Sequence, residues 1–558
     1  MKSLASSKCA GGLLVALAMA SLSLMTACGS SNNIVTPNQG GFGDGNLTGT
    51  YVISITGTDI NTSNGAVVPF AIAGTVVANG TGGIESGTLD INDPGNIGVD
   101  LGEAVSSTSA YQIGKDGRGT GTLVTTVGSF NVDFVMITSS HGLISRFDTL
   151  GTGSGTIDLQ TPTPSISGAY AFSLAGTDFV QNPQGNPLGT VGAFAVNGNS
   201  IGGIEDFNND GSSNDLTSLT LSGQLAVGAS GAPSTATLTT NFGSLGFDVW
   251  VIDSTHLKFI ETDTDESLIL LAGDAFTQVT SLAPGQLVFV LGGMDGGGLP
   301  VSAGGYATTD ANGNLTNGFE DYNDAGTVGL AKPFSTSTAG CVAGRCVLTL
   351  AGFTNGDASV TGFVVYPSSG GGQALEIDSL GLLQGASFSQ SATAFTDSGG
   401  YGLNFSGQNN VDGNAPGIVN DIAQFDAGAP DASFTGTPTP NMTGVLDEND
   451  LDDLRSSSTM SGVYVPDSPV DGRGTIESNN NNTELGGFTL QYYVVDPSTV
   501  VFIDVDSEAV NGVGSQLGVG TFEAQSSSGG QAARGAAARS HVVIVHPAIR
   551  AHGAFERK

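Results

Sequence analysis

A Gly-x-x-Asp-x-Asn segment occurs four times in this chain at a nearly constant spacing. The copies begin at Gly87, Gly203, Gly318 and Gly444. We call this segment the marker, and its shared acid and amide are Asp90 and Asn92, Asp206 and Asn208, Asp321 and Asn323, and Asp447 and Asn449. A recurrence of this length corresponds to a whole domain, well beyond the roughly 20 to 50 residues of a solenoid repeat. The chain is therefore expected to contain four tandem domains of one design.

The two ends of each domain also recur. An alternating apolar segment opens the repeats at Tyr51, Tyr170, Leu287 and Tyr401, and the repeats close on Gln160, Gln278, Gln390 and Gln525. The opening positions are 119, 117 and 114 residues apart. These landmarks predict β repeats at residues 48–160, 168–278, 285–390 and 400–525.

Short alternating runs and turn residues predict the fold of each repeat. The chain has 86 glycines, while 39 % of its residues are apolar, which is typical of β structure with many turns. In the first repeat the runs predict eight strands, with the marker on the third. Asn-Gly pairs at Asn79-Gly80, Asn197-Gly198 and Asn312-Gly313 predict hairpin turns, because both residue types tolerate positive φ.

Eight hairpin-linked strands have an economical arrangement, in which the last strand pairs with the first and no sheet edge stays exposed. We therefore predict an all-β fold of four tandem eight-stranded antiparallel up-and-down barrel-like domains, with β-sandwiches as the alternative. Barrel interiors would be lined by residues such as Tyr51, Ile53 and Ile55. Short linkers stiffened by proline, such as residues 161–164, suggest four beads on a semi-rigid string.

The charge of the chain excludes one class of partner. The formal net charge is −36, and residues 48–525 hold eight Lys or Arg against 49 Asp or Glu. A field of this sign repels phosphate backbones and anionic lipid. Nucleic acid is therefore not an expected partner.

The N-terminal segment has the three parts of a secretory signal. Lys2 and Lys8 precede an apolar run at residues 10–24, and small residues lead to Cys28. The run is too short and too early for a membrane-spanning helix. Residues 1–27 are therefore predicted to be a lipoprotein signal peptide and Cys28 to be the lipidated first residue of the mature protein. The alternative is an ordinary signal peptide with a chance cysteine.

The segments that flank the repeats differ from them in composition. Residues 28–47 are polar and glycine-rich, which predicts a flexible tether. Residues 526–558 hold five basic residues against one acid, which predicts a basic, disordered tail. A tail of this charge would alternatively bind the acidic repeats or a polyanion.

The lipoprotein leader, the Gly-x-Tyr openings such as Gly49-Thr50-Tyr51, the Asn-Gly turns and the marker together resemble acidobacterial-type repeat lipoproteins. The resemblance covers most of residues 1–525. It implies a location in the cell envelope and a repeat architecture, and it implies no reaction. Gly29 follows Cys28 in place of the aspartate that retains some lipoproteins at the inner membrane, so an outer-membrane location is expected.

Two cysteines lie inside the third repeat. Cys341 and Cys346 flank an Ala-Gly centre that is typical of a hairpin turn, so their sulfurs could face each other across paired strands. A disulfide that closes so small a loop stabilises by roughly 2 kcal/mol at best. The alternative is a metal-binding pair, which lacks the second Cys or His pair of a zinc site.

The marker is the best candidate for a ligand site. In the second repeat Asp206, Asn208 and Asp210 precede Gly211 and fit the start of a calcium loop. No copy has the closing glutamate of such a loop. The alternative is that the marker Asp and Asn end the third strand by bonding backbone amides in an Asx-type turn. Calcium in the second repeat is the one cofactor that the sequence suggests.

Catalysis has little support in the sequence. His141 and His256 are the histidines inside the repeats, and both are expected in an exposed turn between the sixth and seventh strands, where the other copies have Gly370 and Ser498. A shared Ser-His-Asp site is therefore not expected. The leading interpretation is a lipid-anchored, non-enzymatic protein of the cell envelope with an interaction or structural role. Its partners would be the membrane through Cys28 and an envelope polysaccharide or protein. The alternatives are an array of small-ligand or carbohydrate-binding barrels and, third, an extracytoplasmic hydrolase.

Overall fold

Antiparallel strands make up most of the chain that the structure describes. A computed structural model describes residues 41–527 except 163–164, 181, 183–184, 210–215, 230, 242, 264–268, 355–361, 397–398, 410–416, 435–439, 452, 479–487 and 507–515. Cys28 and the tail beyond residue 527 lie outside these residues. Within them, no helix is long and apolar enough to span a membrane.

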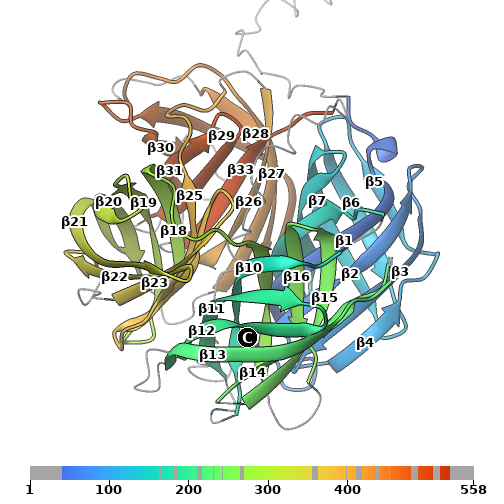
Figure 1. The fold of residues 1–558 in the computed structure, drawn as a ribbon. Helices are drawn as coiled ribbons and strands as arrows, with labels where there is room; N and C mark the ends of the chain where they lie inside the picture. The colour runs from blue at the N-terminus through green and yellow to red at the C-terminus, as the bar shows by residue number, and fades with distance from the viewer. Residues whose placement is uncertain are drawn as a thin grey trace, which may run out of the picture. The chain divides into compact units, whose positions relative to one another are not determined.

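The second repeat shows the common design. Its strands are β10 (Gly168–Asp178), β11 (Asn186–Asn197), β12 (Ser200–Asn209), β13 (Leu216–Ala226), β14 (Ser234–Thr240), β15 (Gly243–Asp253), β16 (His256–Glu261) and β17 (Ile269–Thr277). Each strand pairs with the next, and β17 pairs with β10, so the sheet closes into a barrel. Figure 1 shows β10 to β13 running side by side in this order.

The third and fourth repeats close in the same way. The strands of barrel 3 are β18 (Gly285–Asp295), β19 (Pro300–Thr309), β20 (Leu315–Asp324), β21 (Thr327–Val342), β22 (Arg345–Ala351), β23 (Gly362–Ser368), β24 (Gly371–Glu376) and β25 (Gly381–Ser389). Those of barrel 4 are β26 (Gly399–Asn409), β27 (Gly417–Ala427), β28 (Met442–Asp450), β29 (Asp453–Pro466), β30 (Arg473–Ser478), β31 (Thr489–Asp496), β32 (Thr499–Val505) and β33 (Leu517–Ala524).

The first repeat differs because its fourth strand is interrupted. After the short 3-10 helix η1 (Asp44–Asn46), its strands are β1 (Thr48–Ile60), β2 (Val67–Asn79), β3 (Ile84–Asp93), β4 (Gly98–Ala104), β5 (Ala110–Ile113), β6 (Arg118–Val124), β7 (Ser129–Thr138), β8 (His141–Asp148) and β9 (Gly151–Leu159). The Tyr111 amide donates to the Gly82 carbonyl oxygen at 2.9 Å, and Gly83 bridges to Ala110. These contacts join β5 to the start of β3 and close the barrel.

The predicted fold class, four eight-stranded antiparallel up-and-down barrels, is therefore confirmed. The glycines of the three predicted turns, Gly80, Gly198 and Gly313, all have positive φ. Strand β4 has a sequence with two glycines in seven residues and little apolar alternation, so the sequence gives only a weak strand signal there.

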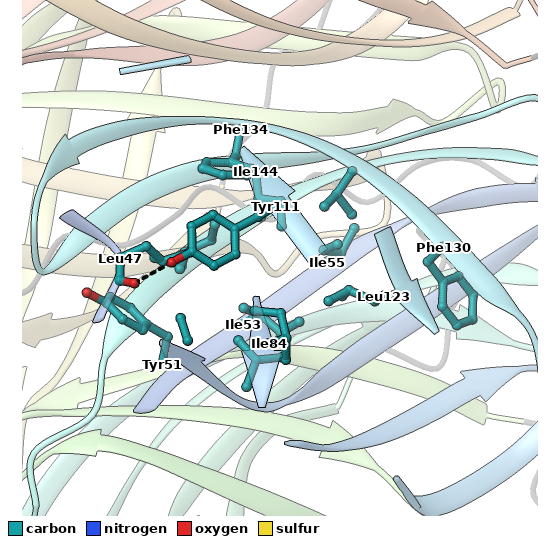
Figure 2. Close-up of a cluster of buried hydrophobic side chains, with 14 of the residues drawn as sticks. Leu47, Tyr51, Ile53, Ile55, Ile84, Tyr111, Leu123, Phe130, Phe134 and Ile144 are labelled. Atoms are coloured by element: carbon teal, nitrogen blue, oxygen red, sulfur yellow. Dashed lines mark hydrogen bonds between the residues drawn. The ribbon is translucent and has the colours of Figure 1, made fainter. Parts of the chain in front are cut away.

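Side chains fill the barrel interiors. In barrel 1 the predicted lining residues Tyr51, Ile53 and Ile55 belong to one buried apolar cluster. Figure 2 shows this cluster, in which the Tyr111 hydroxyl donates to the Leu47 carbonyl oxygen at 2.8 Å. The interiors of barrels 3 and 4 contain cavities of about 60 and 50 Å³.

A second set of apolar clusters lies outside the barrels, where one barrel packs against another. Ile260 and Trp250 of barrel 2 cluster with Val52 of barrel 1, and Tyr366 of barrel 3 clusters with Val191 of barrel 2. Further clusters join barrel 3 to barrel 4 and barrel 4 to barrel 1. These strands therefore contribute buried apolar side chains on both of their faces.

Candidate functional site

The marker forms the last part of the third strand of each barrel, and the strand ends one residue after the marker asparagine. β3 continues to Asp93, and the equivalent strands continue to Asn209, Asp324 and Asp450. The pairing with the fourth strand is interrupted beside the marker acid in every copy. The marker acid therefore lies at a β-bulge. In the third copy the Oδ1 atom of the marker Asn323 also accepts the Gly326 amide at 2.9 Å, as the Asx-type alternative expected.

One carboxylate oxygen of the marker acid repairs its own bulge. The Oδ1 atom of Asp206 accepts the Ser218 amide at 2.7 Å. Oδ1 atoms of the other three marker acids accept amides in the same way, from Gly102, Ala331 and Ser457. All four donors have positive φ, an uncommon conformation for residues other than glycine. The acid thus satisfies an amide that the interrupted ladder leaves without a strand partner.

The same carboxylate binds the next barrel. Asp206 accepts hydrogen bonds from Arg345 Nε at 2.8 Å and Nη2 at 2.6 Å, and from the Tyr366 hydroxyl at 2.5 Å. Asp321 is held by barrel 4 in the same arrangement, with Arg473 Nε and Nη2 at 2.7 Å and the Tyr493 hydroxyl at 2.5 Å. These acids are almost fully buried. A forked arginine suits a buried carboxylate because it donates two parallel hydrogen bonds.

The other two junctions use parts of this arrangement. Arg118 of barrel 1 reaches Asp447 of barrel 4, with 3.4 Å between Nη1 and Oδ2. In barrel 1, Val135 occupies the position that Tyr366 and Tyr493 have in barrels 3 and 4. At the junction of barrels 1 and 2, Ser234 replaces the arginine, and Trp250 Nε1 donates to Asp90 Oδ2 at 2.7 Å. All four marker acids therefore face the following barrel, and barrel 1 follows barrel 4.

The marker asparagines bind carbonyl groups at the end of the seventh strand and at the start of the eighth strand of the next barrel. Asn208 Nδ2 donates to the carbonyl oxygens of Glu376 and Gly381 at 2.9 and 2.8 Å. Asn323 makes three such bonds to barrel 4, and Asn449 makes three to barrel 1. Asn92 donates to the carbonyl and to the side chain of Glu261 in barrel 2.

The residues that close each repeat also reach the next barrel. Gln160 Nε2 donates to the Val251 carbonyl oxygen at 2.8 Å, and Gln390 Nε2 donates to that of Val494 at 2.9 Å. Gln525 donates to the Met136 carbonyl oxygen of barrel 1 at 2.9 Å. The amides of the next residues, Thr161, Val279, Ser391 and Ser526, continue the pattern with the carbonyl oxygens of Ile252, Pro367, Val495 and Ile137.

The inter-barrel contacts therefore form a closed cycle, from barrel 1 to 2, 2 to 3, 3 to 4 and 4 back to 1. The expectation of four beads on a semi-rigid string is wrong. The physical reason is that each marker carries buried hydrogen-bonding groups that only a neighbouring barrel satisfies.

The predicted calcium ligands are only partly described. Asp206 is engaged by Arg345 and Tyr366, Asn208 donates to barrel 3, and Asp210 lies outside the described residues. Among the described residues, no group of three or more His, Cys, Asp or Glu is placed to hold a metal ion. Calcium in the second repeat stays a prediction, and a melting temperature unchanged by millimolar calcium would remove it.

Cys341 and Cys346 form a disulfide directly across the β21–β22 pair. Arg345, which binds Asp206, immediately precedes Cys346. The disulfide therefore closes the turn that carries the arginine of the barrel 2/barrel 3 junction.

The two repeat histidines are not in exposed turns, and that expectation is wrong. His256 begins β16, is buried, and lies 2.6 Å from Asp274 Oδ1, which Lys258 Nζ approaches at 2.7 Å. His141 begins β8 and lies 2.7 Å from Asp158 Oδ1. Burial disfavours its charged form, but Asp158 and Glu523 outweigh burial and raise the pKa of His141 to about 10. A histidine held charged by two acids is an ion-pair partner and not a general base at neutral pH.

Sequence reasoning missed the partners of the marker. A Gly-Arg pair recurs as Gly117-Arg118, Gly344-Arg345 and Gly472-Arg473. Tyr366 and Tyr493 recur on the sixth strand at the position of Trp250. Alignment of the repeats on these residues would have revealed the donors, but not which barrel they bind.

Comparison with known proteins gives little. No protein-family model matches the chain, and no curated protein matches it. Among solved structures, the chain is similar to a crystal structure of the vaccine antigen transferrin binding protein B, a tryptophan-to-alanine mutant from Haemophilus parasuis Hp5. The two are 9 % identical over 85 % of this chain and 95 % of that chain, with a TM-score of 0.17. A TM-score this low assigns no function to the chain.

Proposed function

We propose that this chain is a lipid-anchored protein of the cell envelope with an interaction or structural role and no enzymatic activity. The observation that carries the proposal is that the recurring polar residues of the four barrels make contacts between barrels. The marker acids and asparagines are buried at junctions between barrels, where they and the partly exposed Gly-Arg arginines hold the barrels together. The location rests on the leader that ends at Cys28.

The filled interiors support this function over an array of small-ligand sites. The cavities of about 60 and 50 Å³ in barrels 3 and 4 are well below the roughly 150 Å³ of an engineered apolar cavity that binds benzene. A sugar or a lipid chain would require larger space. A protein or polysaccharide partner would instead bind the acidic outer surface.

The location is tested by fractionation. Wild-type protein is expected in the outer-membrane fraction, and the Cys28→Ser variant is expected in soluble extracytoplasmic fractions. Protease added to intact cells then reports whether the barrels face outward. Unchanged fractionation of Cys28→Ser would count against the lipid anchor.

Native mass spectrometry tests whether the purified protein retains a bound ligand. Protein purified from membranes is expected to show the same mass under native and denaturing conditions, apart from weakly bound ions. A reproducible additional mass that is lost on unfolding would favour the small-ligand alternative. A screen of envelope glycans and proteins with the full chain then searches for the partner.

A further inference from the structure

The closure of barrel 1 leaves one strand edge without a strand partner. β4 pairs with β3 and ends its sheet, so no other strand among the described residues pairs with its outer edge. The contacts that close the barrel come from β5, through Ala110 and Tyr111. Figure 1 shows β4 beside β3. An unpaired edge is a template for a further strand, because its outward amides and carbonyl oxygens have no ladder partner.

This edge is exposed and acidic. Leu101 is 42 % exposed, and the charged residues of β4 are Asp100 and Glu103. The Glu103 carboxylate accepts the Thr126 hydroxyl at 2.5 Å, which places the turn between β6 and β7 beside this end of β4. Val127 of that turn is 36 % exposed. The edge therefore offers backbone groups, negative charge and exposed apolar side chains to a partner.

The described part of the chain ends on the same barrel. The Ser526 amide donates to the Ile137 carbonyl oxygen at 2.8 Å, and Gln525 Nε2 donates to that of Asp116 at 2.9 Å. Asp116 lies in the turn after β5, the strand that follows β4 in the chain. The tail beyond residue 527 therefore starts at the barrel whose edge is open.

The tail contains one segment with the sequence of a strand. Residues 542–545 are Val-Val-Ile-Val, with His541 before them and His546 and Pro547 after them. β-branched residues favour strands. An apolar run of this kind is an aggregation hazard while it stays unpaired. Pairing it with an open edge would protect both.

Charge and chain length both match this segment to β4. Residues 526–558 hold five basic residues against one acid, opposite in sign to Asp100 and Glu103. The chain between residues 527 and 541 can span about 46 Å. The ten-residue strand β3, along which β4 runs, is only about 33 Å long. The segment can therefore reach the whole edge.

We propose that residues 541–546 of the tail add a strand to the open edge of β4 and extend the sheet of barrel 1. In strand addition the main chain supplies the hydrogen bonds, and the side chains select the partner. The apolar side chains of the segment favour an edge that exposes Leu101. Arg539 and Arg550, on either side of the segment, are attracted to the acids of β4.

Hydrogen exchange of the full chain tests the proposal. In the wild type, the β4 amides that point away from β3 are expected to be protected. Ile544→Pro removes a backbone donor from the middle of the segment and disfavours pairing, so this protection should be lost while β1 to β3 keep theirs. Ala533→Pro, a matched proline in the tail outside the segment, should exchange like the wild type. Equal exchange of β4 in the wild type and Ile544→Pro would overturn the proposal.

Two further measurements make the test specific. Asp100→Lys should lower the protection of β4 in the wild-type background but not in the Ile544→Pro background. A loss of the same size in both backgrounds would contradict a contact with the tail. The protection should also be independent of protein concentration. Protection that rises with concentration would place the tail of a second copy on the edge and would overturn the assignment to the chain's own tail.

Discussion

At the scale of single residues, the marker acid joins two barrels through one carboxylate. Asp206 accepts the Ser218 amide of its own barrel and the Arg345 guanidinium of the next. Neither contact is visible in the local sequence, because Ser218 is 12 residues away from Asp206 and Arg345 is 139 residues away. The residue therefore resembled a calcium ligand or a strand cap in isolation.

Asp206→Ala is expected to destabilise the chain by about 3 kcal/mol, because it leaves the partly buried Arg345 and the fully buried Tyr366 hydroxyl without their carboxylate. Urea unfolding of the full chain measures this loss. The double variant Asp206→Ala with Arg345→Leu should lose less than the sum of the single variants. Additive losses would show that the two residues do not interact.

Glu320 gives a pH prediction in barrel 3. It is fully buried, Oε1 accepts the Thr354 amide at 2.9 Å, and Oε2 has no hydrogen-bond partner among the described residues. Burial raises the pKa of Glu320 to about 9, against the opposing effect of the Thr354 amide. The folded chain thus keeps a proton that the unfolded chain loses above its ordinary pKa.

Stability should therefore fall as pH rises from about 4.5 to about 9, the window between the two pKa values. Glu320→Gln removes this contribution, so its melting temperature relative to wild type should increase between pH 5 and pH 9. Glu85→Gln, an exposed control, should follow the wild type. Parallel curves for Glu320→Gln and wild type would contradict the assignment.

At the scale of elements, the β21–β22 hairpin combines a covalent closure with an inter-barrel contact. Its disulfide closes a loop of six residues, for which the loop-entropy relation gives about 2 kcal/mol. Cys341→Ser with Cys346→Ser should lower stability by about this amount, and a reductant should have the same effect on wild type but none on the variant. No loss in either experiment would contradict a stabilising disulfide.

Strand number and closure could be predicted because their signals are local. Tyr51, Ile53 and Ile55 alternate as a barrel strand requires, and Asn-Gly pairs specify turns. Val52 lies between these residues and is also buried, because its face packs against barrel 2. Three consecutive apolar residues, Tyr51, Val52 and Ile53, were the available sign of that second packed face.

At the scale of the whole molecule, the four barrels share one docking mode. Each barrel binds the next one along the chain in this way, and barrel 4 binds barrel 1. Such head-to-tail contacts either continue into filaments or close into rings. Sequence comparison shows that the repeats are equivalent, but closure depends on the rotation between neighbours. That rotation is set by side-chain packing and cannot be inferred from repeat spacing.

The contact between the two ends of the cycle tests this account most directly. Asn46 Nδ2 donates to the Ser527 carbonyl oxygen at 3.4 Å, across 481 residues. Asn46→Cys with Ser527→Cys, in a Cys28→Ser background, should form an intramolecular disulfide on oxidation and migrate faster on a non-reducing gel. The control pairs Asn46→Cys with Ala392→Cys, because Ala392 follows Gln390 as Ser527 follows Gln525. A closed cycle predicts a link in the first pair and none in the control, and failure of the first pair to link would contradict it.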